Sequence, residues 1–275
     1  MKIAQNRSKK TLILPAILLA VSVCFGVIIF INYNPAHSPT VPKSVTTKKS
    51  ETVKAQESVT AKQSTPEVTK TEPKTITTAF DKSKYSTTDP SSIWIVANKQ
   101  HQLNPAQFAP SDLVTYGNAT ISSKAIDDLR AMTQAASSAS VTLTAVSSYR
   151  SYSTQNTLYN NYVASNGQVA ADTFSARPGY SEHQTGLAID FGSIGNSGCN
   201  FDDCFATTAE GSWLAAHAYE YGFLLRYTTD KQSITGYKNE PWHYRYIGRE
   251  LAAEMKKQSI ITLEEFFGVS GGTNY

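Results

Sequence analysis

Residues 179–191 read GYSEHQTGLAIDF, and this stretch decides how the rest of the chain is interpreted. Its first part is polar and rich in glycine, as in a loop, whereas Leu187 to Phe191 is strand-like. His183 lies in the loop, and Asp190 follows seven residues later on the strand. This spacing allows a loop and the strand after it to turn two ligand atoms toward one point. A His beside an Asp is in most proteins a structural pair, so a functional site needs further partners.

Those partners occur in residues 239–248, which read NEPWHYRYIG. His243 has Glu240 three residues before it, and Pro241 between them stiffens the backbone. Catalytic zinc in hydrolases takes three protein ligands and leaves the fourth position to water. We therefore expect His183, Asp190 and His243 to be the ligands of one Zn²⁺, although two imidazoles and a carboxylate could also hold other divalent ions. Glu240 is then the expected catalytic base beside the metal.

The strand expected over 141–145 runs into residues 147–151, SSYRS, which contain the cationic residue Arg150. Arg150 is permanently charged and suits either an oxyanion or the carboxylate of a substrate, although a surface salt bridge is the plainer interpretation of an isolated arginine. The remaining histidines are not expected to bind metal. His37 lies in a Ser/Thr-rich segment, His101 in a turn, and His217 inside a helix near apolar residues.

The elements mix without regular alternation, which favours an α+β fold with helices packed on a mostly antiparallel sheet. Residues 105–117 resemble a loop, and residues 240–246 lead into the last helix. We expect helices over 122–138, 153–165, 210–221 and 247–258, and strands over 93–97, 141–145, 187–191 and 223–227.

The chain has 275 residues, and an uncharged apolar run occupies residues 11–31. Such a run can span a bilayer, and the basic residues before it place the N-terminus in the cytoplasm. Cleavage of this segment and lipidation at Cys24 are alternatives. Residues 32–80 are rich in Ser, Thr, Pro and Lys, as in a disordered tether. The expected organisation is a cytoplasmic tail (1–10), a transmembrane signal anchor (11–31), this tether, and an exported domain (81–275). The protein would be a single-pass protein of the cell membrane with its catalytic domain on the cell-wall side.

Charge and cysteine usage limit the partners of the exported domain. Residues 81–275 hold 14 basic and 18 acidic side chains, which argues against a nucleic-acid binder. Cys199 and Cys204 lie close together in GCNFDDC. In an exported protein such a pair favours a disulfide over two unlinked thiols, and a zinc finger would need a second pair.

Three blocks resemble a known family in order and spacing. They are SSYRSYSTQ (147–155), SEHQTGLAID (181–190) and EPWHYRY (240–246), and they resemble the zinc D-alanyl-D-alanine carboxypeptidases of the vancomycin-resistance type. That family is grouped with the lysostaphin-type endopeptidases and the amino-terminal signalling domain of hedgehog. The resemblance implies the fold of this group, a mostly antiparallel sheet with flanking helices around a single zinc site. It implies that His183, Asp190 and His243 hold one zinc and that Glu240 is the base. It also implies that Arg150 stabilises the oxyanion or anchors the substrate, and that Gln155 and Ser181 contact the peptide.

The resemblance implies hydrolysis of the peptidoglycan stem peptide at the outer face of the membrane. The first hypothesis is a D,D-carboxypeptidase that trims the terminal D-alanine of the pentapeptide. An L,D-carboxypeptidase acting on the tetrapeptide is the alternative within the same fold. A peptidoglycan endopeptidase is disfavoured because no repeated wall-binding module is visible. A non-catalytic, zinc-stabilised wall-binding protein is disfavoured because Glu240 is present.

Overall fold

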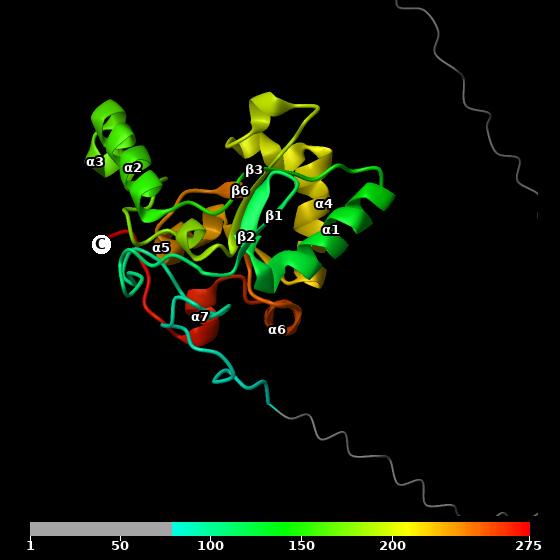
Figure 1. Cartoon of the computed structure of the whole chain (residues 1–275), viewed down its shortest axis with the longest axis horizontal. Helices are drawn as coiled ribbons and strands as arrows, with labels where there is room; N and C mark the ends of the chain where they lie inside the picture. The colour runs from blue at the N-terminus through cyan, green and yellow to red at the C-terminus, as the bar shows by residue number, and fades with distance from the viewer. Residues whose placement is uncertain (1–78) are drawn as a thin grey trace, which may run out of the picture. The chain divides into compact units, whose positions relative to one another are not determined.

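A four-stranded antiparallel sheet lies at the centre of the structure, which is a computed structural model that describes residues 79–275. Its strands follow the order β3-β4-β6-β5, and a separate hairpin pairs β1 with β2. The expected α+β fold with an antiparallel sheet and flanking helices is confirmed (Figure 1). The strands are β1 (Leu113–Tyr116), β2 (Ala119–Ser122), β3 (Thr144–Ser147), β4 (Ala188–Gly192), β5 (Phe223–Tyr227) and β6 (Glu240–Tyr246). The helices are α1 (Ile126–Ser138), α2 (Tyr152–Asn166), α3 (Gln168–Ala171), α4 (Ala209–His217), α5 (Gln232–Thr235), α6 (Arg249–Gln258) and α7 (Leu263–Phe267).

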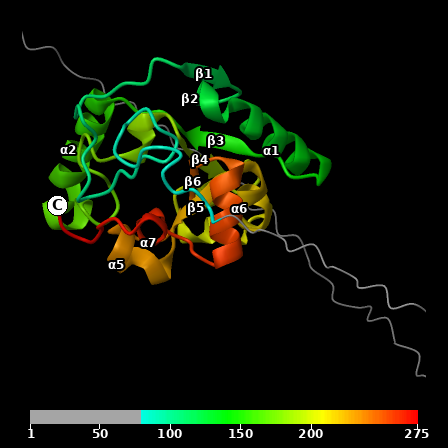
Figure 2. The ribbon, with the colours of Figure 1, turned by 90° about the horizontal axis from the view of Figure 1, so that it is seen from below.

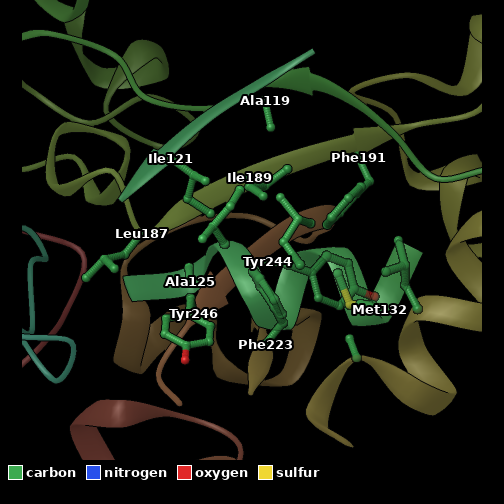
Figure 3. Close-up of a cluster of buried hydrophobic side chains, with 14 of the residues drawn as sticks. Ala119, Ile121, Ala125, Met132, Leu187, Ile189, Phe191, Phe223, Tyr244 and Tyr246 are labelled. Atoms are coloured by element: carbon green, nitrogen blue, oxygen red, sulfur yellow. The ribbon is translucent and has the colours of Figure 1, made fainter. Parts of the chain in front are cut away.

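One face of the sheet carries the main apolar cluster. Side chains alternate between the two faces of a strand, so Ile189 and Phe191 of β4 share this face with Tyr244 of β6. Leu129 and Met132 of α1 belong to the same buried cluster. Figure 3 shows Met132 of the helix beside Ile189, Phe191 and Tyr244 of the strands. The apolar positions of α1 recur at intervals of three and four residues, and this is why the helix can cover the sheet.

The opposite face of the central strands is polar. Asp190 of β4 lies directly across from His243 of β6, and Ala188 lies across from Arg245. Because cross-strand partners point to the same side of the sheet, the register alone brings Asp190 and His243 together. The loop between β4 and α4 carries two short 3₁₀ turns, and Cys199 and Cys204 are joined there by a disulfide.

Several local expectations need correction. Residues 93–97 form no strand, although they are buried; Trp94 packs with α6 and α7, and its Nε1 donates to the carbonyl of Ile247 at 3.0 Å. Burial against helices therefore explains the apolar run without any strand pairing. Residues 240–246 precede the last helix as expected, but they also form β6, a central strand of the sheet, which was not foreseen. Part of the loop expected over 105–117 belongs to the β1–β2 hairpin.

The helices expected around α1, α2 and α6 are present, and the helix expected over 210–221 is divided between α4 and a 3₁₀ turn, Ala218–Tyr221. The helix pair α2 and α3 lies at the opposite end of the described region from α1, and the two views agree on this (Figures 1 and 2). Leu158 and Tyr162 of α2 line one cavity together with Asp190 and His243 of the polar face.

The predicted localisation as a single-pass protein of the cell membrane is corrected. Within residues 79–275, none of the helices is long and apolar enough to cross a bilayer. The longest of them, α2, has 15 residues, whereas a span takes about 20 apolar residues. The predicted anchor, residues 11–31, and the tether up to residue 78 lie outside the described residues. The membrane-spanning arrangement is not retained.

Candidate metal centre

Two of the three predicted metal ligands lie on neighbouring strands. Nδ1 of His243 is 3.1 Å from Oδ1 of Asp190, as expected for side chains that face each other across an antiparallel pair. Ser147 of β3 lies across from Asp190 on its other side. Three strands therefore fix the position of the Asp190 carboxylate.

His183 reaches the same point from the 3₁₀ turn Glu182–Thr185, which precedes β4. Its Nε2 lies 3.1 Å from Oδ2 of Asp190, and its Nδ1 lies 2.7 Å from the carbonyl oxygen of Ser148. The turn ends at Gly186, whose φ of 71° is left-handed. A Cβ there would lie 2.8 Å from a methyl carbon of Leu113. The positive φ favours glycine at the end of this turn, and any side chain there would be strained and would displace Leu113.

The three side chains form a set of ligands that fits a divalent cation. One atom each of His183, Asp190 and His243 can be chosen so that all lie within 4.8 Å of one another, and all three residues are buried. Oδ1 of Asp190 is buried and accepts no hydrogen bond among the described residues, although Nδ1 of His243 lies 3.1 Å away. A buried carboxylate oxygen without a donor, beside two imidazole nitrogens, is the arrangement expected of a metal site.

Electrostatics distinguishes the acidic groups of the site. Burial raises the pKa of Asp190, but the neighbouring His183 and His243 outweigh it and hold this pKa well below its usual range. Burial lowers the pKa of His243, yet its contacts with Asp190 and Glu182 raise it to about 9. Burial also raises the pKa of Glu240 to about 8. Burial therefore makes Glu240 a weaker acid than an ordinary carboxyl group.

A cavity of about 640 Å³ opens over the ligands. Glu240 lies on its wall, with Oε2 3.7 Å from Nδ1 of His243. Arg150 also lines the cavity, with Nη2 3.9 Å from Oδ2 of Asp190. The guanidinium is held in place because it donates to the side chains of Ser147 and Gln155 at 2.8 and 2.7 Å. The carboxylate of Glu240 and the fixed guanidinium of Arg150 therefore both line the cavity within 4 Å of the candidate ligands.

The two predicted peptide-contacting residues have different environments. Ser181 is buried and lines the cavity. Gln155 is buried behind Arg150, and its amide nitrogen donates to the carbonyl of Ala176 at 2.6 Å. Its contacts therefore hold Arg150 from behind. The contacts of both residues with a peptide stay predictions.

Comparison with known proteins matches the part of the chain that contains the three sequence blocks of the site. A family model described as VanY: D-alanyl-D-alanine carboxypeptidase matches residues 118–249. A protein of Bacillus subtilis (strain 168) named as a carboxypeptidase, YodJ, is 41% identical over 189 residues, which cover 65% of this chain and 68% of that protein. The chain belongs to the VanY family of D-alanyl-D-alanine carboxypeptidases.

Two solved structures extend the likeness to the fold. The LdcB LD-carboxypeptidase is 40% identical with a TM-score of 0.60, over 66% of this chain and 89% of that one. A mutant of the vancomycin resistance D,D-pentapeptidase VanY, in complex with Zn(II), is 32% identical with a TM-score of 0.54, over 62% of this chain and 97% of that one. The VanY-family likeness therefore includes both D,D- and L,D-acting proteins.

Of the histidines that were not expected to bind metal, His101 and His217 lie apart from the cluster of His183, Asp190 and His243, and His37 lies outside the described residues. Nε2 of His101 lies 2.9 Å from the hydroxyl of Ser270. His217 packs on Trp213 with ring centroids 5.0 Å apart and is partly exposed. The residues between the disulfide cysteines do reach the cavity, since Phe201, Asp202 and Asp203 line it.

Sequence analysis missed a buried ionic network beside the cluster of His183, Asp190 and His243. Glu182 bridges His243 to Arg226 and Arg245, and Arg226 also pairs with Glu264. A usable signal was the single arginine in the strand FLLRY, because a lone charge inside an otherwise apolar or aromatic strand requires a buried partner. The partner could not be found by spacing, since Glu182 and His243 are 61 residues apart.

Proposed function

We propose that this chain is a zinc-dependent carboxypeptidase that removes the terminal D-alanine from the peptidoglycan stem peptide, with one Zn²⁺ per chain. Its VanY-family membership supports this activity. The observation that carries the metal is the buried cluster of His183, Asp190 and His243, in which one carboxylate oxygen of Asp190 accepts no hydrogen bond. Zinc held there would polarise the scissile carbonyl and lower the pKa of a bound water to about 7.

The chain's own residues take the remaining roles. Glu240 accepts a proton from the attacking water and returns it to the amine of the departing D-alanine, so one carboxylate serves both halves of the reaction. Its raised pKa, about 8, suits this exchange. His183, Asp190 and His243 would hold the ion, and the cavity that these residues line would admit water and substrate.

Arg150 supplies fixed positive charge at the wall of the cavity. Because Ser147 and Gln155 hold its guanidinium, no reorganisation is needed as negative charge develops on the substrate. The same geometry suits the terminal carboxylate of the stem peptide. Ser181, in the cavity wall, is positioned to contact the peptide backbone. In this assignment Gln155 acts on the substrate through Arg150.

Two bonds are candidates, and each has an observation in its favour. The family's name favours the D-alanyl-D-alanine bond of the pentapeptide. The greater identity to LdcB, 40% against 32% for the VanY D,D-pentapeptidase, favours an L,D-carboxypeptidase that acts on the tetrapeptide. The two substrates differ in the configuration of the residue before the scissile bond, so the cavity wall must decide between them.

The experiment measures D-alanine release from pentapeptide and tetrapeptide stems offered separately to the full chain, together with its zinc content. Release from the pentapeptide alone assigns the D,D-activity, and release from the tetrapeptide alone assigns the L,D-activity. One zinc per chain with no release from either stem would contradict the proposed reaction and leave the metal centre standing. Release with no bound metal would contradict the metal centre.

A further inference from the structure

We propose that Glu182 is the positioning residue of the metal centre: it fixes the tautomer of His243 by accepting the proton on Nε2, so that Nδ1 faces Asp190 and His183 with a free lone pair. This inference rests on the proposed metal site. It concerns a residue that lines the cavity floor and supplies no ligand atom to the predicted set.

The geometry separates the two nitrogens of the His243 ring. Nδ1 lies 3.1 Å from Oδ1 of Asp190 on the cavity side, and Nε2 lies 3.1 Å from Oε2 of Glu182 on the opposite side. A neutral imidazole carries one proton, and only the deprotonated nitrogen can bind a metal. An ionised carboxylate only accepts hydrogen bonds, so Glu182 draws that proton to Nε2.

The carboxylate of Glu182 cannot turn away from His243. Its other oxygen, Oε1, accepts from Nε of Arg226 at 2.8 Å and from Nη1 of Arg245 at 3.0 Å. The side chain of Glu182 is fully buried, with 0% of its surface exposed. Both oxygens therefore have fixed partners, and no water is needed to satisfy them.

The two arginines are themselves fixed by distant parts of the chain. Arg245 donates to the carbonyls of Ile93 and Ile95 at 3.1 and 2.9 Å. Arg226 donates to both oxygens of Glu264 in α7, at 3.0 and 2.7 Å. The residues of these last contacts, 93–95 and 264, lie outside the range 118–249 matched by the family model. Segments flanking the matched region thus contact the two arginines that pair with Glu182, whereas Glu182 alone among these residues contacts His243.

A purely structural role is the alternative, because two buried Glu–Arg pairs could serve the fold alone. The network itself provides a matched comparison. Glu264 is as deeply buried as Glu182, at 2% exposure each, and pairs with the same Arg226, but it does not contact His243. A structural role predicts similar consequences for the two residues, whereas a positioning role predicts that only Glu182 affects the metal.

The decisive variants are Glu182→Gln and Glu264→Gln in the full chain. Glutamine keeps the shape of Glu182 and can still accept from the arginines through its oxygen. Its amide nitrogen would then face Nε2 of His243, and two donors cannot pair. The imidazole would be driven to the other tautomer, with the proton on Nδ1 where the metal should bind.

Zinc affinity is measured by competition with a chromophoric chelator, and unfolding of the metal-free proteins is followed in parallel. We expect Glu182→Gln to weaken zinc binding by about 10- to 100-fold, the usual effect of removing a partner of a ligating histidine. Glu264→Gln should change zinc affinity by less than about threefold on the same scale while also lowering stability. Equal losses of affinity in the two variants, or an unchanged affinity in Glu182→Gln, would overturn the inference.

A measurement on the unmodified chain covers the case in which a variant fails to fold. In the zinc-loaded protein, ¹⁵N NMR of the imidazoles should show His243 with a proton on Nε2 and the metal on Nδ1. The reverse assignment would overturn the role of Glu182 even if the metal centre is real. Failure of the unmodified chain to bind zinc would instead remove the proposed metal centre itself, which distinguishes the two failures.

Discussion

The two faces of the central sheet follow opposite rules, although they belong to the same strands. On β4, Ile189 and Phe191 point into the apolar cluster, and Asp190 between them points toward the candidate ligands His183 and His243. The apolar face needs complementary shape and gains free energy from the area it buries. The polar face needs each donor and acceptor matched, because a buried unpaired group is costly. A substitution on the first face should therefore reduce stability, and one on the second should reduce function.

Metal removal should have the largest effect on activity, and it should disturb only the polar face of the sheet. Treatment of the full chain with a chelator is expected to abolish D-alanine release, and added Zn²⁺ should restore it, because the proposed reaction depends on the ion. The apolar cluster uses no metal ligand, so far-UV circular dichroism should keep the folded signal throughout. Hydrolysis that persists in the chelated protein would remove zinc from the mechanism.

Glu240→Gln should come next, with kcat lower by about 10²- to 10⁴-fold, the usual contribution of a general acid–base group. Zinc content should stay the same, since Glu240 is not among the predicted ligands. The free energy of unfolding should not fall, because burial already disfavours the charged form of this carboxylate. Steady-state kinetics and metal analysis check the separation of the two effects.

A matched control for that variant is Glu254→Gln, which removes a carboxylate from α6, where Glu254 contacts only neighbouring residues of its own helix. It should leave kcat within about twofold of the unmodified value, since surface substitutions have small effects. If Glu240→Gln also kept its full turnover, Glu240 would not be the base.

Ile189→Ala tests the apolar face at a position adjacent to Asp190. Ile189 is fully buried in the main cluster, so the truncation should lower the free energy of unfolding by about 2–5 kcal/mol. Zinc affinity measured well below the melting temperature should be unchanged, because the side chain points away from the ligands. A loss of affinity comparable to the loss of stability would show that the two faces are coupled through the backbone of β4.

The site was more predictable than the sheet that builds it, and the reason is local spacing. His183 and Asp190 lie seven residues apart, and Glu240 and His243 three apart, so each pair is visible within one short stretch. The pairing of β4 with β6 joins residues more than 50 positions apart and leaves no local pattern. Segment 240–246 was expected only to lead into the last helix, and the strand that it forms contains Pro241 and a charged Arg245. The folded structure accommodates Arg245 in the strand because its charge is paired with Glu182, and this pairing is not visible in the sequence.

The opposite error occurred at residues 93–97, where a run of apolar side chains indicated a strand. Burial and strand pairing are separate properties, and Trp94 is buried by α6 and α7 without any sheet partner. Glu182 was overlooked for a related reason. It stands in SEHQ beside a recognised ligand, where an acidic residue resembles a solvated loop residue. Only its two arginine partners, from strands 44 and 63 residues away, show that it is fully buried.

Removal of the disulfide should have the smallest effect. The loop that it closes contacts both the apolar cluster and the cavity. Cys199 packs in the apolar cluster, and Phe201, Asp202 and Asp203 line the cavity. Phe201 packs on Trp242 with ring centroids 6.0 Å apart, and Asn239 donates to Asp203 at 2.8 Å, so the loop is attached to the start of β6. The double substitution Cys199→Ser and Cys204→Ser should therefore lower stability by about 2 kcal/mol, the value for so short a closed loop.

The same double variant should raise KM for the stem peptide while kcat and zinc affinity stay close to their original values. The loop borders the cavity, but the ligands and Glu240 are supplied by β4, β6 and the turn before β4. Denaturant unfolding and steady-state kinetics on one preparation measure both effects. A fall in kcat without a change in KM would place the loop in the chemical step, and a loss of stability with unchanged kinetics would confine it to the apolar face.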